Sequence, residues 1–128
     1  MNRLNNNKTI YFFVSKQDFN NKIIYPKIPI HKSDNENDKI KRICVSQSIY
    51  GCLSALSALP VLMTDDIINI YKCYSNNVIK PLKKDVIDVD LTGEIWLIEP
   101  VKMFFYKKIQ ITGVIKSIYS IAYSFNYI

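Results

Sequence analysis

Apolar and β-branched runs along this chain predict mostly β-strands. The clearest strand runs from Thr9 to Ser15, where aromatic and β-branched residues are followed by polar ones. A second strand covers Ile67 to Tyr74 and is closed by turn-forming residues from Ser75 to Asn77. Three shorter strands are predicted at Glu94 to Ile98, Val101 to Tyr106 and Lys108 to Thr112. β-Structure therefore dominates the predicted fold.

One stretch instead has the apolar spacing of a helix. A short strand from Ile43 to Val45 leads through a Ser-Gln-Ser junction into residues whose apolar positions share one helical face. That face consists of Ile49, Cys52, Leu53 and Leu56. Ser46 or Ser48 can cap the helix by accepting hydrogen bonds from its first free N–H groups. We therefore predict one main helix over residues 47–58, packed against the sheet.

Polar and proline-containing segments separate these elements. Residues 22–30 carry two prolines, which favours an extended segment with little strand pairing. Residues 31–41 are the most polar run and are predicted to be a mobile loop, while residues 1–8 are predicted to be a flexible N-terminus. The tail from Ile115 to Ile128 has apolar residues near helical spacing but is rich in tyrosine and isoleucine, so it is compatible with either a helix or a strand, and we favour a helix.

Composition bounds the size and class of the fold. With 128 residues, of which 48% are hydrophobic, the chain is long enough for one domain with a real core and too short for two. We predict a single α+β domain over residues 1–128 with a dominant, mostly antiparallel β core. No apolar run approaches the roughly 20 residues that cross a bilayer, and the polar start lacks the core of a signal peptide. We therefore expect a cytoplasmic protein without a membrane partner.

Cysteine and histidine usage favours no metal site. Three cysteines, Cys44, Cys52 and Cys73, occur at irregular spacing inside apolar segments, which favours buried reduced thiols over a disulfide or metal ligands. The one histidine, His31, has no cysteine or acid at ligand spacing. A nucleophilic pair of His31 with Cys44 or Cys52 is disfavoured, because a reactive thiol needs a partly exposed, electropositive pocket.

The net charge of +6 leaves nucleic-acid binding as a minor alternative. Lysines are spread along the whole sequence, and the chain has only two arginines, Arg3 and Arg42. Nucleic-acid binders more often cluster lysine and arginine on one face with exposed aromatic residues between them. The nine tyrosines could stack on bases, but most fall at apolar positions that predict burial.

Glu94 is the carboxylate best placed for chemistry. It follows the Thr92-Gly93 turn and begins an apolar strand that contains Trp96. A strand-end position next to a turn suits a ligand contact, although most acids in such positions are simply solvated. Spacing alone therefore names no reaction.

Four short motifs follow one another along most of the chain. They lie at Tyr11 to Ser15, Lys27 to Pro29, Arg42 to Ser46 and Thr92 to Trp96. In this order they resemble a family of small phage and mobile-element proteins related to the ADP-ribosyltransferase-like fold. That family has a leucine-tyrosine-histidine-valine-serine first strand, then arginine-isoleucine-cysteine-phenylalanine-serine before a helix, and later a threonine-glycine-glutamate-aromatic strand.

The resemblance implies a split β core that holds NAD in a cleft. By position, Ser46 matches the hydroxyl that would line the NAD pocket, and Glu94 matches the glutamate that would support transfer of ADP-ribose to an acceptor. Ser48, at the same junction, and Phe13, on the first strand, are the other residues predicted to lie at the cofactor. The family histidine would hydrogen-bond the nicotinamide ribose, but Phe13 stands in its place and a phenyl ring has no donor.

Two classes of function follow from these observations. The first is a phage-type binding protein on a catalytically degenerate scaffold, an inhibitor that antagonises a host defence complex in the manner of an anti-CRISPR protein or sequesters a nucleotide signal. Its partner would be a host protein or nucleoprotein complex, contacted by Lys39, Lys41 and Arg42 as steering charges. The second is an active NAD-dependent ADP-ribosyltransferase that uses Glu94 to modify a host protein or nucleic acid.

Overall fold

Antiparallel strands make up most of the computed structural model, which describes residues 8–28, 39–55, 62–83, 89–117 and 121–128. The strands are β1 (Thr9–Ser15), β2 (Ile23–Ile24), β3 (Ile43–Val45), β4 (Ile67–Ser75), β5 (Val78–Ile79), β6 (Ile95–Leu97), β7 (Val101–Lys102), β8 (Phe104–Lys116) and β9 (Ile121–Tyr127). The helical segments of these ranges are α2 (Ile49–Ala55) and α3 (Val89–Thr92).

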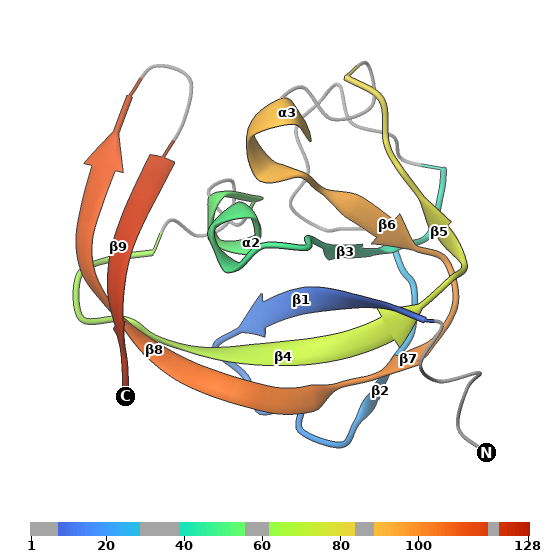
Figure 1. Ribbon diagram of the computed structural model, residues 1–128, viewed down its shortest axis with the longest axis horizontal. Coiled ribbons are helices and arrows are strands. Elements are labelled where there is room, and N and C mark those ends of the chain that lie inside the picture. The colour runs from blue at the N-terminus through green and yellow to red at the C-terminus, as the bar shows by residue number, and fades with distance from the viewer. Residues whose placement is uncertain (1–7, 29–38, 56–61, 84–88, 118–120) are drawn as a thin grey trace.

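The main sheet has the strand order β1-β4-β8-β9. Its longest strand, β8, pairs with β4 through its first half and with β9 from Ile109 onward. Register shifts at Ile70/Tyr71 and at Ile111/Gly113 mark bulges, which bend a strand and increase its twist. As a result the sheet curves, and the β8–β9 arm rises beside α2 (Figure 1).

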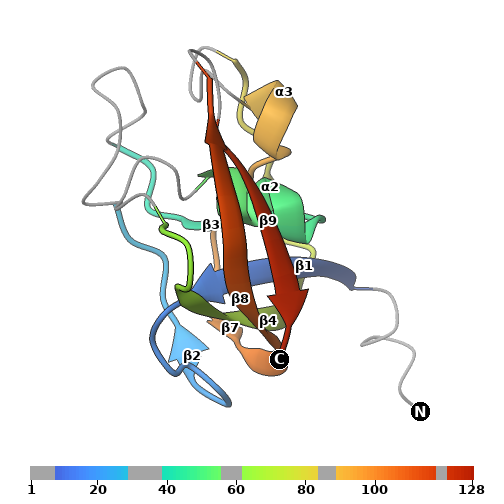
Figure 2. The same ribbon diagram turned by 90° about the vertical axis from the view of Figure 1, so that its left-hand side faces the viewer.

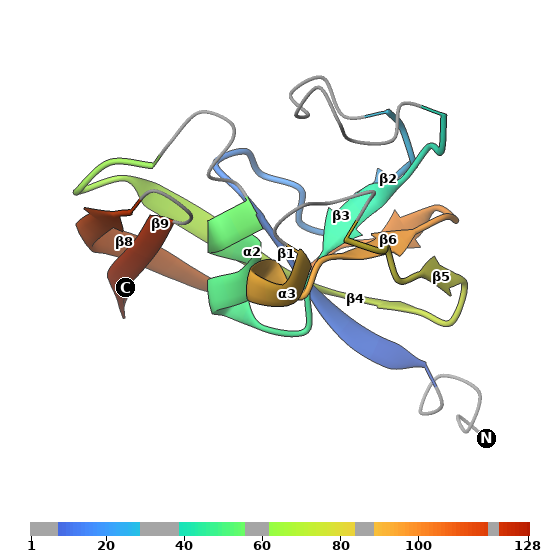
Figure 3. The ribbon, with the colours of Figure 1, turned by 90° about the horizontal axis from the view of Figure 1, so that it is seen from above.

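Two smaller sheets complete the pairing. One has the order β3-β6-β5 and the other pairs β2 with β7. An isolated antiparallel bridge between Phe12 and Ser46 connects the edge strand β1 to the end of β3. The view from above shows β3, β6 and β5 on one side of β1 and the β8–β9 arm on the other (Figure 3).

Strand β1 divides the apolar core into two clusters, because successive side chains of a strand point to opposite faces. Tyr11 belongs to the first cluster and Val14 to the second. The first packs β1 and β4 against residues of both smaller sheets. It comprises Tyr11, Ile43, Val45, Tyr71, Cys73, Ile95, Leu97, Val101 and Met103. The second packs α2 against the main sheet and comprises Val14, Cys52, Leu53, Leu62, Ile68, Ile70, Ile109, Ile111 and Tyr123.

The fold confirms the predicted α+β class with a mostly antiparallel β core. Strand β1 has the predicted bounds, and β4 is one residue longer than the predicted strand. The segment predicted to be extended, residues 22–30, contributes the two-residue β2 and an isolated bridge between Lys27 and Arg42 within its described part. The two strands predicted after Pro100 form instead a short β7 and one continuous β8, since exposed lysines can sit inside a strand without ending it.

The prediction of a helix in the tail is wrong. Residues Ile121–Tyr127 form β9, which pairs with β8 and places Val114 opposite Tyr123. Tyr123 is buried in the second cluster. The spacing of apolar residues in the tail is compatible with a helix or a strand. Pairing with β8 supplies hydrogen-bond partners for the backbone of the tail and buries the ring of Tyr123.

The predicted helix is present and short. Helix α2 covers Ile49–Ala55, and its predicted face buries Cys52 and Leu53 while Ile49 packs partly against the second cluster. Leu56 and residues 57–58 of the prediction lie outside the described residues, as do residues 1–7 of the predicted N-terminus and residues 31–38 of the predicted loop. Neither helical segment of the described ranges is long and apolar enough to cross a membrane.

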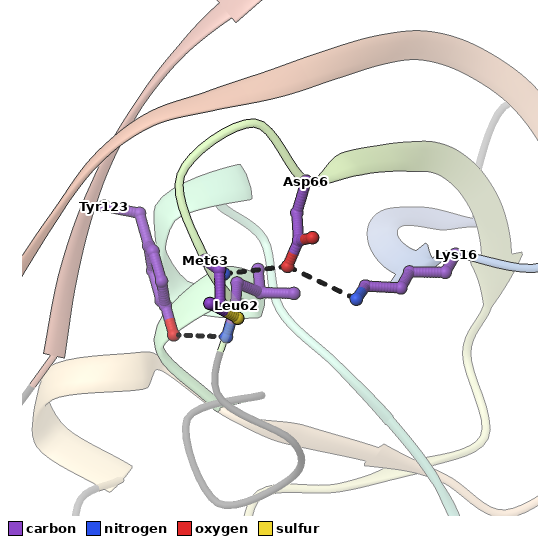
Figure 4. A network of polar contacts seen from close by, with 5 residues as sticks. All are labelled: Lys16, Leu62, Met63, Asp66 and Tyr123. Atoms are coloured by element: carbon purple, nitrogen blue, oxygen red, sulfur yellow. Dashed lines mark hydrogen bonds and ion pairs between the residues drawn. The ribbon is translucent and has the colours of Figure 1, made fainter.

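The turn that enters β4 is held by a polar network (Figure 4). The carboxylate of Asp66 accepts a hydrogen bond from the backbone N–H of Met63 at 2.7 Å and lies 3.2 Å from the ammonium of Lys16. The hydroxyl of Tyr123 accepts from the N–H of Leu62 at 3.3 Å. These contacts connect β9 and the segment after β1 to the start of β4.

We expect the Asp66 contacts to stabilise the fold only above acidic pH. The hydrogen bond from Met63 and the nearby Lys16 lower the pKa of Asp66 below its usual 3.8. A carboxyl whose folded pKa is lowered adds stability above its unfolded pKa and loses it as the pH falls through the folded pKa. Asp66→Asn should therefore cost about 1 kcal/mol in urea unfolding at pH 7 and almost nothing near pH 2. Asp65→Asn, at the exposed neighbour, is the matched control and should leave stability unchanged at both values of pH. An Asp66→Asn cost that is equal at both would contradict the expectation.

Candidate functional site

Serine hydroxyls organise the junction between β3 and α2. The hydroxyl of Ser46 donates to the carbonyl of Thr92 at 2.9 Å and accepts from the N–H of Ser48 at 3.2 Å. The hydroxyl of Ser48 accepts from the N–H of Gly51 at 2.8 Å, which is the geometry of a helix N-cap. Ser48 therefore caps α2, and Ser46 ties the same junction to the end of α3.

The Thr-Gly-Glu motif brings α3 into β6 through a tight turn. Gly93 has φ +62°, in the left-handed region that favours glycine, and its N–H donates to the carbonyl of Val89 at 2.9 Å. The hydroxyl of Thr92 accepts from the N–H of Glu94 at 3.1 Å. The turn therefore ends α3 and sets Glu94 directly before β6, two residues after Thr92, whose carbonyl Ser46 contacts.

Glu94 is buried and bonded to a neighbouring side chain. It is 9% exposed, and its Oε2 accepts a hydrogen bond from the indole N–H of Trp96 at 2.7 Å. Glu94 lies directly before β6 and Trp96 lies within it, and two residues in extended chain separated by one position point to the same side. Because this hydrogen bond is buried, it fixes the orientation of both side chains.

Gly51 permits the close approach of α2 to α3. A Cβ at this position would lie 2.1 Å from the carbonyl oxygen of Thr92 and 2.5 Å from the hydroxyl of Ser46. Real Cβ atoms do not come that near a backbone oxygen, so only glycine fits. The sequence signal for this contact was a glycine inside a helical pattern, which usually has a packing reason.

Arg42 corrects the prediction of a surface contact. It is only 2% exposed, its guanidinium carbon lies 4.0 Å from the centroid of the Trp96 ring, and Nη1 donates to the carbonyl of Ile40 at 2.9 Å. A buried and stacked guanidinium cannot touch a partner, so the predicted role is wrong for Arg42. Lys39 and Lys41 are exposed, and their contact role stays a prediction.

Phe13, the counterpart of the family histidine, lies in an aromatic cluster. Its ring centroid is 6.0 Å from that of Phe19 and 6.4 Å from that of Tyr71, and it packs against the first core cluster. The residue of β1 that meets the junction is Phe12, whose backbone exchanges hydrogen bonds with Ser46 at 2.7 and 3.2 Å. The Phe13 ring thus contributes apolar packing.

The buried thiols are poor nucleophiles. Burial raises the pKa of Cys52 to about 12, and it also raises the pKa of Cys73 to about 12. Cys52 donates its S–H to the carbonyl of Phe12 at 3.0 Å. Since the thiolate is the reactive form, both residues are protonated and inert at neutral pH. Cys52 and Cys73 are buried as predicted, whereas Cys44 is only partly buried, and the reduced state of the three thiols stays a prediction.

The structure therefore brings Ser46, Ser48 and Glu94 to one junction, through contacts with the ends of α2 and α3. Sequence reasoning missed Gly51 and the stacking of Arg42 on Trp96, both of which depend on residues distant in the chain. No protein-family model, curated protein or solved structure matches this chain.

Proposed function

We propose that this chain acts by binding, as a phage-type inhibitor that antagonises a host defence complex in the cytoplasm. Its partner is a host protein or a nucleoprotein complex, and its scaffold is a catalytically degenerate relative of the ADP-ribosyltransferase-like fold with a split β core. In support of that scaffold, β1 pairs with β4 on one side and bridges to Ser46 on the other, as a core divided between two sheets requires.

One observation carries the choice of binding over catalysis: the polar side chains that the resemblance would use on NAD are bonded within the protein. Ser46 holds the Thr92 carbonyl, and the buried carboxylate of Glu94 holds the indole of Trp96. A carboxylate that supports transfer of ADP-ribose must reach the acceptor, and this one is 9% exposed. The ring of Phe13 cannot donate to a ribose oxygen.

Exposed lysines supply the proposed steering of partners. Lys39 and Lys41 precede the junction directly and are exposed, and the chain has a net charge of +6. Long-range attraction of this kind accelerates association with acidic or nucleic-acid-containing partners and weakens as salt is added. Arg42 is no longer part of this proposal.

The second candidate, an active ADP-ribosyltransferase, rests on a specific observation as well. Ser46 and Glu94 both contact Thr92, so the two residues that match the family pattern lie at one place. An enzyme of this kind would need the Trp96 indole to release the carboxylate when NAD and an acceptor bind.

Incubation with radiolabelled NAD and purified CRISPR effector complexes separates the two candidates. We expect the chain to inhibit at least one effector at a stoichiometric ratio, with no dependence on NAD and no transfer of label. Glu94→Gln tests the carboxylate, and Glu99→Gln is the matched control, an acid that contacts Ser75. Transfer of label that is lost in Glu94→Gln and kept in Glu99→Gln would replace the binding proposal with the enzyme. Absence of both inhibition and label transfer across the effectors would reject the proposed inhibitor.

A further inference from the structure

A group of half-exposed rings and lysines covers one part of the main sheet. We call it the aromatic–lysine face, and it consists of Lys72, Tyr74, Phe104, Tyr106, Lys107 and Tyr127. Its residues come from β4, β8 and β9, the strands of the curved sheet (Figures 1 and 2). Its four rings are exposed by 36% to 52%. A group of large aromatic side chains that remain exposed to solvent on neighbouring strands is typical of an interaction surface.

The rings and lysines of the face form a connected row. Tyr74 and Phe104 lie 5.9 Å apart between centroids in an edge-to-face arrangement, and Lys72 is directly opposite Phe104 in the strand register. The ammonium of Lys72 lies 4.2 Å from the centroid of the Tyr106 ring. That row continues through Lys107, whose ammonium lies 5.6 Å from the Tyr106 ring and 4.6 Å from the Tyr127 ring.

The row lies at the part of β8 that pairs with β4 but not with β9. Pairing of β9 with β8 begins at Ile109, and before it β8 pairs with β4. Side chains on both sides of β8 are exposed over residues 104–108. An extended chain could therefore run across the rings of the face and past the lysines beside them.

The charge of the main sheet has one sign. Its four strands contain no aspartate or glutamate, although the chain has 11 such residues. The lysines of these strands are Lys72, Lys107, Lys108 and Lys116. Lys72 and Lys107 belong to the aromatic–lysine face, and lysines on strands that contain no acids are complementary to a polyanion.

We infer that the aromatic–lysine face binds single-stranded nucleic acid, with lysines on phosphates and rings stacked on bases. The inference rests on the proposed binding function and names the part of a nucleoprotein complex that the chain would contact. The exposed rings favour a single strand over a duplex. A duplex hides the faces of its bases, whereas a single strand exposes them for stacking on aromatic side chains. The sequence pattern missed this surface because its lysines and rings are brought together by strand pairing.

Fluorescence anisotropy with a labelled oligothymidylate of 20 nucleotides tests the face. We expect micromolar binding at low salt that weakens as salt rises, and weaker binding of a duplex of the same length. The double substitution of Phe104→Leu with Tyr106→Leu should reduce affinity about tenfold or more, since stacking on one ring is worth that much per base. Tyr25→Leu is the matched control, because Tyr25 is 66% exposed and belongs to residues outside the main sheet.

A lysine pair gives a second readout that keeps the apolar surface intact. Lys72→Gln with Lys107→Gln should lower the slope of log affinity against log salt by about 1.4, or about 0.7 for each phosphate contact. The control, Lys22→Gln with Lys27→Gln, removes the same charge from exposed positions outside the main sheet. It should lower the slope of log affinity against log salt far less. Thermal melting of each variant checks that it is folded.

Three results would overturn the inference. They are equal effects of the two lysine pairs, unchanged affinity in the folded ring variant, and binding to phosphatidylserine vesicles without binding to the oligonucleotide, which would mark a lipid surface. Failure of the face is separable from failure of the proposed function. If the unmodified protein inhibits an effector stoichiometrically but binds no oligonucleotide, only the face is disproved, whereas label transfer from NAD disproves the inhibitor proposal and leaves the face intact.

Discussion

Gly51→Ala is expected to lower the free energy of unfolding by about 3 kcal/mol, which is a large part of the roughly 5–15 kcal/mol that stabilises a domain. The added Cβ would lie 2.1 Å from the carbonyl oxygen of Thr92, a backbone atom that cannot rotate away. Helix α2 must then move from the end of α3, and the Ser46 and Ser48 hydrogen bonds of the junction are lost together. Urea unfolding followed by circular dichroism measures the change.

The matched control is Gly113→Ala in β8. There the added Cβ would lie 2.7 Å from the hydroxyl of Ser124, the end of a side chain that can rotate. We expect a change below about 1 kcal/mol, because alanine also lowers the conformational entropy of the unfolded chain. Similar costs at the two glycines would contradict the proposed close approach of α2 to Thr92.

Trp96→Ala is expected to be still more damaging, at about 4 kcal/mol. Trp96 is fully buried, its indole donates to Glu94, and its ring carries the guanidinium of Arg42. Its truncation creates a cavity, removes a donor from a buried carboxylate and takes away the surface on which a buried cation is stacked. Urea unfolding of the variant at pH 7 gives the cost, and a value below about 1 kcal/mol would refute this account.

A double-mutant cycle separates the indole hydrogen bond from the packing of the ring. Trp96→Phe keeps a ring under Arg42 and removes the donor to Glu94, so we expect an intermediate cost of about 2 kcal/mol. The substitution Glu94→Gln keeps an oxygen that can accept from the indole and should cost less alone. Combined with Trp96→Phe, it should cost less than the sum of the two single substitutions, because both change the same indole–carboxyl contact. Additive costs would show that the hydrogen bond contributes nothing to stability.

These expectations bear on the proposed function. Large costs at Gly51 and Trp96 would show that the contacts of Ser46, Glu94 and Trp96 hold β3, α2, α3 and β6 together. The polar residues of this junction would then serve to stabilise the fold. A partner then has to be recognised elsewhere, on surfaces such as the aromatic–lysine face. The NAD experiment therefore tests whether Glu94 acts in catalysis, and the unfolding measurements test whether its contact with Trp96 stabilises the fold.

The candidate site was partly visible in the sequence. Ser46, Ser48 and Glu94 were selected from their positions at a strand-to-helix junction and a glycine turn, and the structure brings all three together. Their engagement could not be predicted, because the carbonyl that Ser46 contacts lies 46 residues away in the chain. Arg42 is misassigned for the same reason: in the sequence it follows Lys39 and Lys41 and resembles a surface charge, and its stacking on Trp96 depends on a residue far away in the chain.

Local patterns by themselves determined the elements whose signals agree. A β-branched and aromatic run set β1, a similar run set β4, and apolar spacing with a serine cap set the position of α2. Only the tertiary structure decided the tail, where a helical spacing competes with pairing along β8, and the depth at which Arg42 and Glu94 lie. Propensity and periodicity act over a few residues, whereas strand pairing and burial depend on contacts between distant segments, and these contacts determine where the ambiguous residues of this chain lie.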